Sequence, residues 1–163
     1  MARVRSDQPL VPSLLDRLLD YEPEVKREPV KMRHQVLREL KHSVRRDLEN
    51  LLNTRWRSIA WPPKLHEIEP SLANYGIPDL TACNLGSVRD REQLCRIIES
   101  AIRNHEPRFK SVAVRLLDNA EPLDRTLRFR IDAMLHAEPA PEPVVFDSAL
   151  EPATGSVEVK GVG

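Results

Sequence analysis

The stretch IIESAIRNHEPRFKSVAVRL, residues 97–116, contains the point at which the chain changes its hydrophobic period. Before Pro107 the apolar side chains recur at steps of three and four residues, which places them on one face of an α-helix. In SVAVRL, residues 111–116, apolar and polar side chains alternate, as they do in a strand buried on one face. Because a proline disfavours the helical conformation of the residue before it, we expect the helix to end near Asn104 or His105. The stretch therefore predicts a long helix followed directly by a strand.

Two long helices are expected. Ser87 and Asp90 have the S-x-x-D spacing of a capping box, which predicts the start of the helix that ends before Pro107. Its apolar stripe consists of Leu94, Ile97, Ile98, Ala101 and Ile102, with His105 on the same face. An earlier segment, residues 34–54, has the strongest helical pattern of the chain, and Asn53 is a suitable residue to end it. The stripe of this earlier helix consists of Leu37, Leu40, Val44, Leu48 and Leu51.

Strands are expected only after the second of these helices. In LRFRIDAML, residues 127–135, apolar side chains alternate with charged ones, and this strand would pair in antiparallel fashion with residues 111–116. Two shorter strands are predicted in VVFDSA, residues 144–149, and in GSVEVK, residues 155–160. Because helices precede strands, the fold class is α+β, with a small, mostly antiparallel sheet packed on one face by helices.

The chain divides into an N-terminal region, residues 1–33, and a single α+β domain, residues 34–163. The N-terminal region contains a short amphipathic helix, SLLDRLLD, and a charged, proline-interrupted linker. Within the domain, residues 54–86 have no regular pattern, and WPPKLHEIEPSLANYGIPDL contains four prolines and one glycine. A loop of this length in a compact domain is usually functional or contains short helical turns.

The charge balance excludes a global field that would recruit nucleic acid or anionic lipid, because 25 Lys and Arg residues are cancelled by 25 Asp and Glu residues. Cys83 and Cys95 are the only cysteines, and their spacing fits neither a C-x-x-C motif nor a disulfide framework. Cys95 falls within a helical pattern, so we expect a small buried residue there. Asp16 and Arg17 interrupt the apolar run LVPSLLDRLLD, which argues against a signal peptide or a membrane span. We expect a cytosolic protein with no direct insertion into a membrane.

Glu106 and Arg108 flank Pro107 at the predicted junction of helix and strand. In an extended segment, residues two apart point to the same side, so the two side chains should project together. Glu106 follows the C-terminal end of a helix, where the helix dipole repels anions, and Arg108 is the nearest cation. The pair is therefore either a local ion pair at the end of a helix, worth about 0–1 kcal/mol if exposed, or a surface that grips a partner.

Other chemistry is not expected from these residue types and spacings. A general acid in glycoside hydrolysis needs an apolar pocket or a like charge, whereas Glu106 has an arginine beside it. The five histidines show neither H-x-x-x-H nor H-E-x-x-H spacing, and no glycine-rich phosphate loop is present. We therefore predict no catalytic residue, no metal and no cofactor.

A basic segment, KHSVRRDLENLLNTRWR, hints at RNA or DNA because Trp56 and Trp61 lie within or near it. Asp47 and Glu49 interrupt the basic run, as expected for a solvated helix face followed by a packed tryptophan. We expect no nucleic-acid partner.

Four segments together resemble TssE, the family of baseplate subunits of bacterial type VI secretion systems. They are SVRRDLENLLNTR (43–55), SLANYGIPDL (71–80), IIESAIRNHEPRF (97–109) and FRIDAML (129–135), in the order of the family. The most specific elements are DLENLLNTR and the Glu-Pro-Arg triplet. This chain has His105 before the triplet, where the family usually has an aromatic or apolar residue.

The resemblance implies an α+β fold and a structural, non-enzymatic role in the wedge at the membrane-proximal end of a contractile tail. It implies that Glu106, Pro107 and Arg108 bind the helical core formed by TssF and TssG, with TssK as a further baseplate partner. It also implies that the subunit helps to start polymerisation of the sheath proteins TssB and TssC by strand pairing, for which GSVEVKGVG, residues 155–163, is a natural edge. The location would be cytoplasmic, in a complex docked at the inner membrane. The alternatives are a peptidoglycan-cleaving, lysozyme-like enzyme and a small nucleic-acid-binding module.

Overall fold

The structure is a computed structural model. It describes residues 32–56, 71–79, 87–118, 126–137 and 140–162, together with 15, 18, 23–24, 62 and 64–68. Two of the isolated positions, Leu15 and Leu18, are helical and exposed. The rest of the predicted N-terminal helix lies outside the described residues, as do Cys83 and Trp61.

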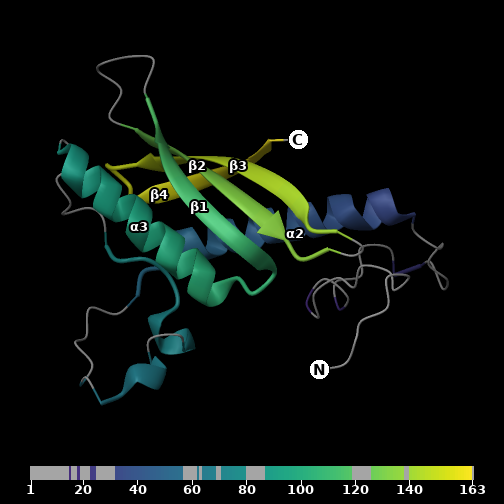
Figure 1. Cartoon of the computed structure of the whole chain (residues 1–163), viewed down its shortest axis with the longest axis horizontal. Coiled ribbons are helices and arrows are strands. Elements are labelled where there is room, and N and C mark those ends of the chain that lie inside the picture. Colours follow the sequence, from purple (N-terminus) through teal and green to yellow (C-terminus); the bar gives the residue numbers. More distant parts are fainter. Residues whose placement is uncertain are drawn as a thin grey trace.

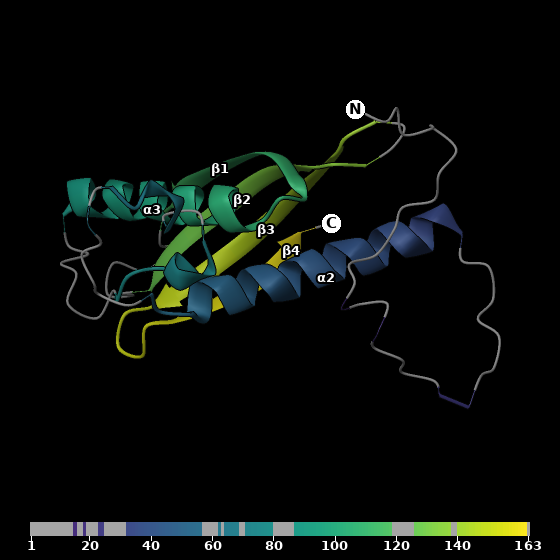
Figure 2. The ribbon, with the colours of Figure 1, turned by 90° about the horizontal axis from the view of Figure 1, so that it is seen from below.

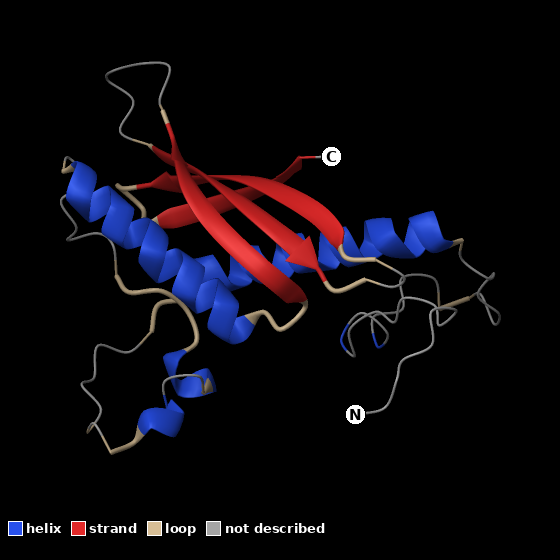
Figure 3. Ribbon diagram, in the orientation of Figure 1, coloured by secondary structure: helices blue, strands red, loops and turns tan. Residues whose placement is uncertain are grey.

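Two long helices precede four strands, as the sequence predicts (Figures 1 and 3). Helix α2 spans Arg33–Asn53 and helix α3 spans Val88–His105. The strands are β1 (Phe109–Leu117), β2 (Leu127–Leu135), β3 (Glu142–Glu151) and β4 (Ser156–Val162). Two short 3₁₀ turns, His66–Ile68 and Leu72–Asn74, lie in the segment predicted to be irregular. Among the described residues, the strands pair with their sequence neighbours only, in the order β1-β2-β3-β4, and every pair is antiparallel.

Both helices cover the same face of the sheet (Figure 2). Helix α3 packs on β1 and α2 packs on β4, so each helix covers one half of that face. The alternation in the sequence follows this arrangement: in β2, Phe129 and Ile131 are fully buried beneath the helices, whereas Arg128 is exposed on the other face. Burial of each such large apolar side chain stabilises the fold by about 1.5–3 kcal/mol. The prediction of an α+β fold with helices on one face is confirmed.

Three details differ from the predictions. Strand β3 has ten residues and is the longest strand, because residues on both sides of VVFDSA continue the pairing with β2. Ser87 is the N-cap residue of α3, but no capping hydrogen bond from its side chain forms among the described residues, so the predicted capping box is absent. The stripe of α2 also includes Ser43 and Leu52, which sequence periodicity alone does not reveal.

Cys95 is buried, as expected. In the described part of the chain, no helix is both long and apolar enough to span a membrane.

Candidate partner-binding site

The junction between α3 and β1 holds the Glu-Pro-Arg triplet. Helix α3 ends at His105, as the following proline requires, and Glu106 is the C-cap residue, whose N–H donates to Ile102 O at 2.8 Å. Pro107 and Arg108 form a turn, and β1 begins at the next residue. Glu106 is only 6% exposed, although it lies where the negative end of the helix dipole disfavours a carboxylate. A buried carboxylate at this position needs a strong partner.

Arg108 supplies that partner and ties the junction to α2. Its Nε donates to Glu106 Oε1 at 2.6 Å, and its Nη2 contacts the other oxygen of the same carboxylate. Nη2 also donates to Asp47 Oδ2 at 2.7 Å, and Nη1 donates to Ser43 Oγ at 3.2 Å. The backbone N–H of Arg108 donates to Glu106 Oε1 at 3.1 Å. We call Ser43, Asp47, Glu106 and Arg108 the clamp.

The clamp leaves little of Arg108 for a partner. A guanidinium has five N–H groups, and the contacts within the chain occupy four of them. Burial by itself would lower the pKa of Arg108, but hydrogen bonds and charge interactions with Glu106 and Asp47 outweigh that effect and raise the pKa. Arg108 therefore stays charged and fixed in place.

A pocket of about 450 Å³ opens beside the clamp. Its walls combine apolar side chains of α2 with the ring of Pro107, and its charged corner is formed by the clamp. The lining residues are Asp47, Leu48, Leu51, Tyr75, His105, Glu106, Pro107 and Arg108. A pocket with apolar walls and a fixed charged corner suits a side chain of a protein partner.

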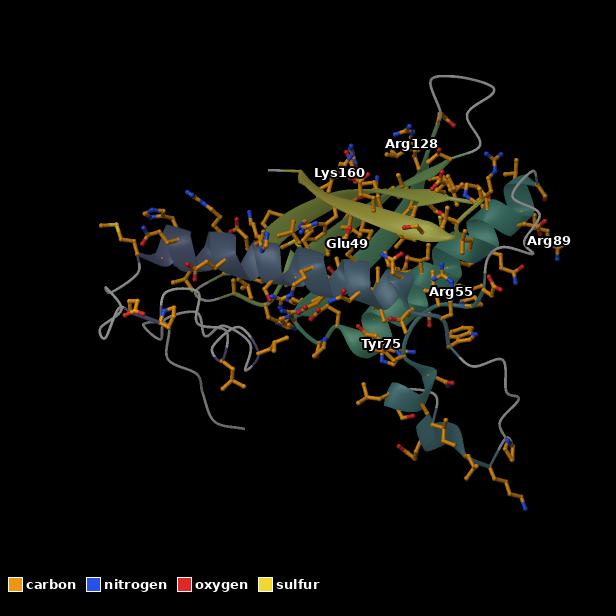
Figure 4. The ribbon with its side chains drawn as sticks, turned by 180° about the vertical axis from the view of Figure 1, so that it is seen from behind. Glu49, Arg55, Tyr75, Arg89, Arg128 and Lys160 are labelled. Carbon is orange, nitrogen blue, oxygen red and sulfur yellow. The ribbon has the colours of Figure 1, made fainter. Side chains whose placement is uncertain are left out.

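Tyr75, from the segment between α2 and α3, also lines this pocket. Figure 4 shows its position near the end of α2. Gly76, which follows it, has φ +115°, and an added Cβ would lie 2.4 Å from Thr54 O, so only glycine fits beside the end of α2. Ile77 then forms a parallel bridge with Arg55, which fixes the segment. Burial, followed by the charges of Asp47 and Glu106, raises the pKa of Tyr75.

The family model described as "Baseplate wedge protein gp25" matches residues 38–140. The chain belongs to this family. The match begins in α2 and ends just before β3, so it includes every residue of the pocket. The resemblance to TssE, which is the homologue of gp25, is confirmed.

Among solved structures, the chain is similar to one described as "The baseplate complex from the type VI secretion system". The identity is 20%, the TM-score is 0.49, and the match covers 70% of this chain and 96% of that chain. A comparison with curated proteins gave no match. The gp25 family is a family of structural baseplate components, and this chain is one of its members.

The structure of this gp25-family chain brings together all three predicted site residues. Glu106, Pro107 and Arg108 line one pocket, and the predicted pairing of the carboxylate with the guanidinium is confirmed. His105, where this chain departs from the usual TssE pattern, packs edge to face on Tyr75, with ring centroids 5.4 Å apart. Sequence reasoning missed Asp47 and Tyr75, although both lie in segments that carry the resemblance.

The basic face of α2 is largely paired within the gp25-family chain. Arg45 contacts Glu49 at 3.1 Å, and Arg46 contacts Asp47 at 3.1 Å. Trp56 is 36% exposed, so it is less packed than the sequence predicts. Within the described residues, no group of His, Cys, Asp and Glu is arranged to hold a metal ion.

Proposed function

We propose that this protein is the wedge subunit of a type VI secretion baseplate, and that it docks onto the wedge core through the pocket at the α3–β1 junction. Membership of the gp25 family supports the baseplate role. The observation that carries the docking site is the clamp: a carboxylate that is 6% exposed is fixed by an arginine at the edge of a pocket with apolar walls.

In this proposal the triplet acts mainly by fixing the shape of the pocket, rather than by direct hydrogen bonds to the partner. Because the donors of Arg108 are used within the chain, the arginine holds α2 and the junction in register and fixes the charged corner of the pocket. A side chain from the helical core of TssF and TssG then enters between Leu48, Leu51 and Pro107. The sequence-based hypothesis that Arg108 itself grips the partner is thereby refined, since one N–H at most is left for that contact.

The finer parts of the role follow from the resemblance. The partners are TssF, TssG and TssK in the baseplate, and TssB and TssC in the sheath, which pair a strand with the sheet and begin to polymerise there. The complex lies in the cytoplasm, docked at the inner membrane. Residues 1–33 form a separate N-terminal region, and residues 34–163 form the wedge domain.

A substitution at the mouth of the pocket tests docking without touching the clamp. Pro107 is exposed and lines the pocket, so Pro107→Lys adds a charge that the apolar walls cannot accommodate. We expect loss of co-purification with TssF and TssG, with the free energy of unfolding changed by no more than about 1 kcal/mol.

The matched control is Pro141→Lys, at another exposed proline away from the pocket. This variant should co-purify as the unchanged protein does. Undiminished co-purification of Pro107→Lys would contradict docking through the pocket. Release of muropeptides from cell-wall sacculi, lost in Glu106→Gln, would instead establish the lysozyme-like enzyme.

A further inference from the structure

The sheet has two edge strands, and the backbone groups that point away from the sheet can be identified on each. In an antiparallel strand, alternate residues direct their N–H and C=O groups to the same neighbour. On β1 the N–H of Val114 points to the carboxylate of Glu99 rather than to β2, so Val112 and Leu116 also face outward. A partner strand would pair with these outward groups.

Side chains of α2 occupy three outward groups in the first half of β4, at Val157 and Val159. Asn53 binds both groups of one residue: its Nδ2 donates to Val157 O at 2.8 Å, and its Oδ1 accepts from Val157 N at 2.9 Å. Arg45 Nη1 donates to Val159 O at 3.1 Å. Helix α2 runs along β4 (Figure 4). The hydrogen bonds place the side chains of Asn53 and Arg45 at the edge of the strand.

Arg55 occupies a further backbone group in the turn that precedes β4. It follows the end of α2, and its guanidinium donates to the carbonyl of Gly155 and, at 2.8 Å, to that of Leu52. Together with Asn53 and Arg45 it makes four hydrogen bonds to the outward side of β4 and the turn before it. A strand that paired with β4 would have to replace these bonds, most of them from groups fixed on a helix.

The edge of β1 is more open than the first half of β4. Within the described residues, one contact from another element reaches the outward backbone groups of Val112, Val114 and Leu116: the 3.3 Å bond from Val114 N to Glu99. The side chains of Val114 and Leu116 are only half-buried against the core, so a fifth strand would complete their cover. On the open face, Arg115 contacts Asp132 of β2 at 3.2 Å, and its side chain is 73% exposed beside this edge.

We propose that the sheet offers one edge to the sheath: β1 accepts a partner strand, and side chains from α2 and the residue Arg55 close the first half of β4. The inference rests on the proposed function, in which a sheath subunit pairs a strand with this sheet. The strand that fits β1 has apolar residues facing α3, beside Val114 and Leu116, and polar residues on the open face, beside Arg115. Closure of β4 keeps copies of the subunit from pairing through that edge before assembly.

The sequence-based hypothesis places the pairing edge at residues 155–163. The proposal places it at β1 instead. Deletion of the C-terminal strand is not a clean test, because Val157 and Val159 are 2% and 1% exposed and belong to the core. Single prolines are cleaner, since an edge strand tolerates proline where the N–H faces outward. Leu116→Pro removes an outward donor on β1, and Gly161→Pro does the same on β4, where an added Cβ meets nothing within 4 Å.

The test compares these variants in cells that assemble sheaths, and it records co-purification with TssF and TssG alongside sheath assembly. We expect Leu116→Pro to lose sheaths while retaining the baseplate partners, and Gly161→Pro to retain both. Sheaths that form with Leu116→Pro and fail with Gly161→Pro would overturn the choice of edge. Loss of the baseplate partners from the unchanged protein would instead overturn the proposed function.

A second measurement covers the case in which Leu116→Pro fails to fold. A photo-reactive benzophenone amino acid is placed at Arg115 beside β1 or at Lys160 beside β4, where the side chains are 73% and 69% exposed. We expect cross-links to a sheath subunit from position 115 only. Cross-links from position 160 only, or cross-links between two copies of this chain at position 115, would refute the proposal.

Discussion

Two arginine–carboxylate pairs in this protein have similar geometry and different surroundings. In each, the Nε and Nη2 atoms of one arginine contact the two oxygens of one carboxylate: Arg108 with Glu106, and Arg130 with Asp147. The side chain of Glu106 is 7% exposed and lies at the junction of α3 and β1, beside α2. The side chain of Asp147 is 36% exposed and lies on the open face of the sheet.

The difference shows that geometry alone does not determine how much an ion pair contributes to the stability of the fold. Arg108 also binds Asp47 and Ser43 on α2, which precede it by 61 and 65 residues in the sequence. It therefore ties the α3–β1 junction to a distant helix. Arg130 joins neighbouring strands, β2 and β3, that their backbone ladder already holds together. Removal of Arg108 leaves a charge buried without a partner, whereas removal of Arg130 leaves a carboxylate that water can solvate.

The largest expected effect is that of Arg108→Ala. With the guanidinium gone, Glu106 stays buried at the negative end of α3, and we expect the free energy of unfolding to fall by about 3–5 kcal/mol at neutral pH. Urea denaturation measures this loss. Co-purification with TssF and TssG should also be lost, but the unfolding data would show that the pocket has collapsed rather than merely lost a contact.

A double variant separates the two causes. Arg108→Met combined with Glu106→Leu removes both charges and keeps apolar volume, so it should be considerably more stable than Arg108→Ala. A single variant that loses less than about 1 kcal/mol would contradict the contrast between the two pairs, because it would place Arg108 among ordinary surface arginines.

An intermediate effect is expected for Asp47→Asn. The substitution weakens one charge-assisted hydrogen bond to Arg108, which should lower the free energy of unfolding by about 1–3 kcal/mol. The pKa of Tyr75 should also fall toward its ordinary value of 10.0, because Asp47 is one of the charges that raise it.

The raised pKa of Tyr75 determines the direction in which stability changes with pH. Because the pKa of Tyr75 is raised in the folded state, the unfolded chain releases the proton first, and stability falls as the pH rises above about 10. The fall should be shallower in Asp47→Asn. Absorbance of tyrosinate in a Tyr21→Phe background reads Tyr75 alone, and an unchanged pKa there would show that Asp47 does not act on the pocket.

Local pattern was enough to predict most of the fold. The change of period at Pro107 located the end of α3 and the start of β1, because both depend on a few neighbouring residues. The Glu106–Arg108 pair was also predictable, since the two residues are two positions apart. Strand length was underestimated for β3, because its ends are held by pairing with β2 rather than by alternation.

The rest of the site depends on contacts that no local pattern encodes. Asp47 looked like an interruption of a basic helix face, and its role follows only when α2 is placed beside the α3–β1 junction. Asn53 looked like a helix terminator, yet its side chain closes the edge of β4, 104 residues away. Tyr75 lines the pocket because Gly76, the next residue, packs its backbone closely against Thr54 O. That close approach cannot be read from the sequence.

The smallest expected effect is that of Arg130→Ala. Hydrogen bonds from Arg130 hold the pKa of Asp147 below its ordinary value of 3.8, so any stability from the pair is present above that pH and is lost as the pH falls. In the variant the pKa of Asp147 should return toward 3.8, which carboxyl NMR titration can follow. Melting curves at neutral pH should barely change, and 1 M salt should remove the difference that remains, since salt screens exposed charges strongly. A loss comparable to that of Arg108→Ala would show that the open face of the sheet, rather than the clamp, holds the critical ion pair.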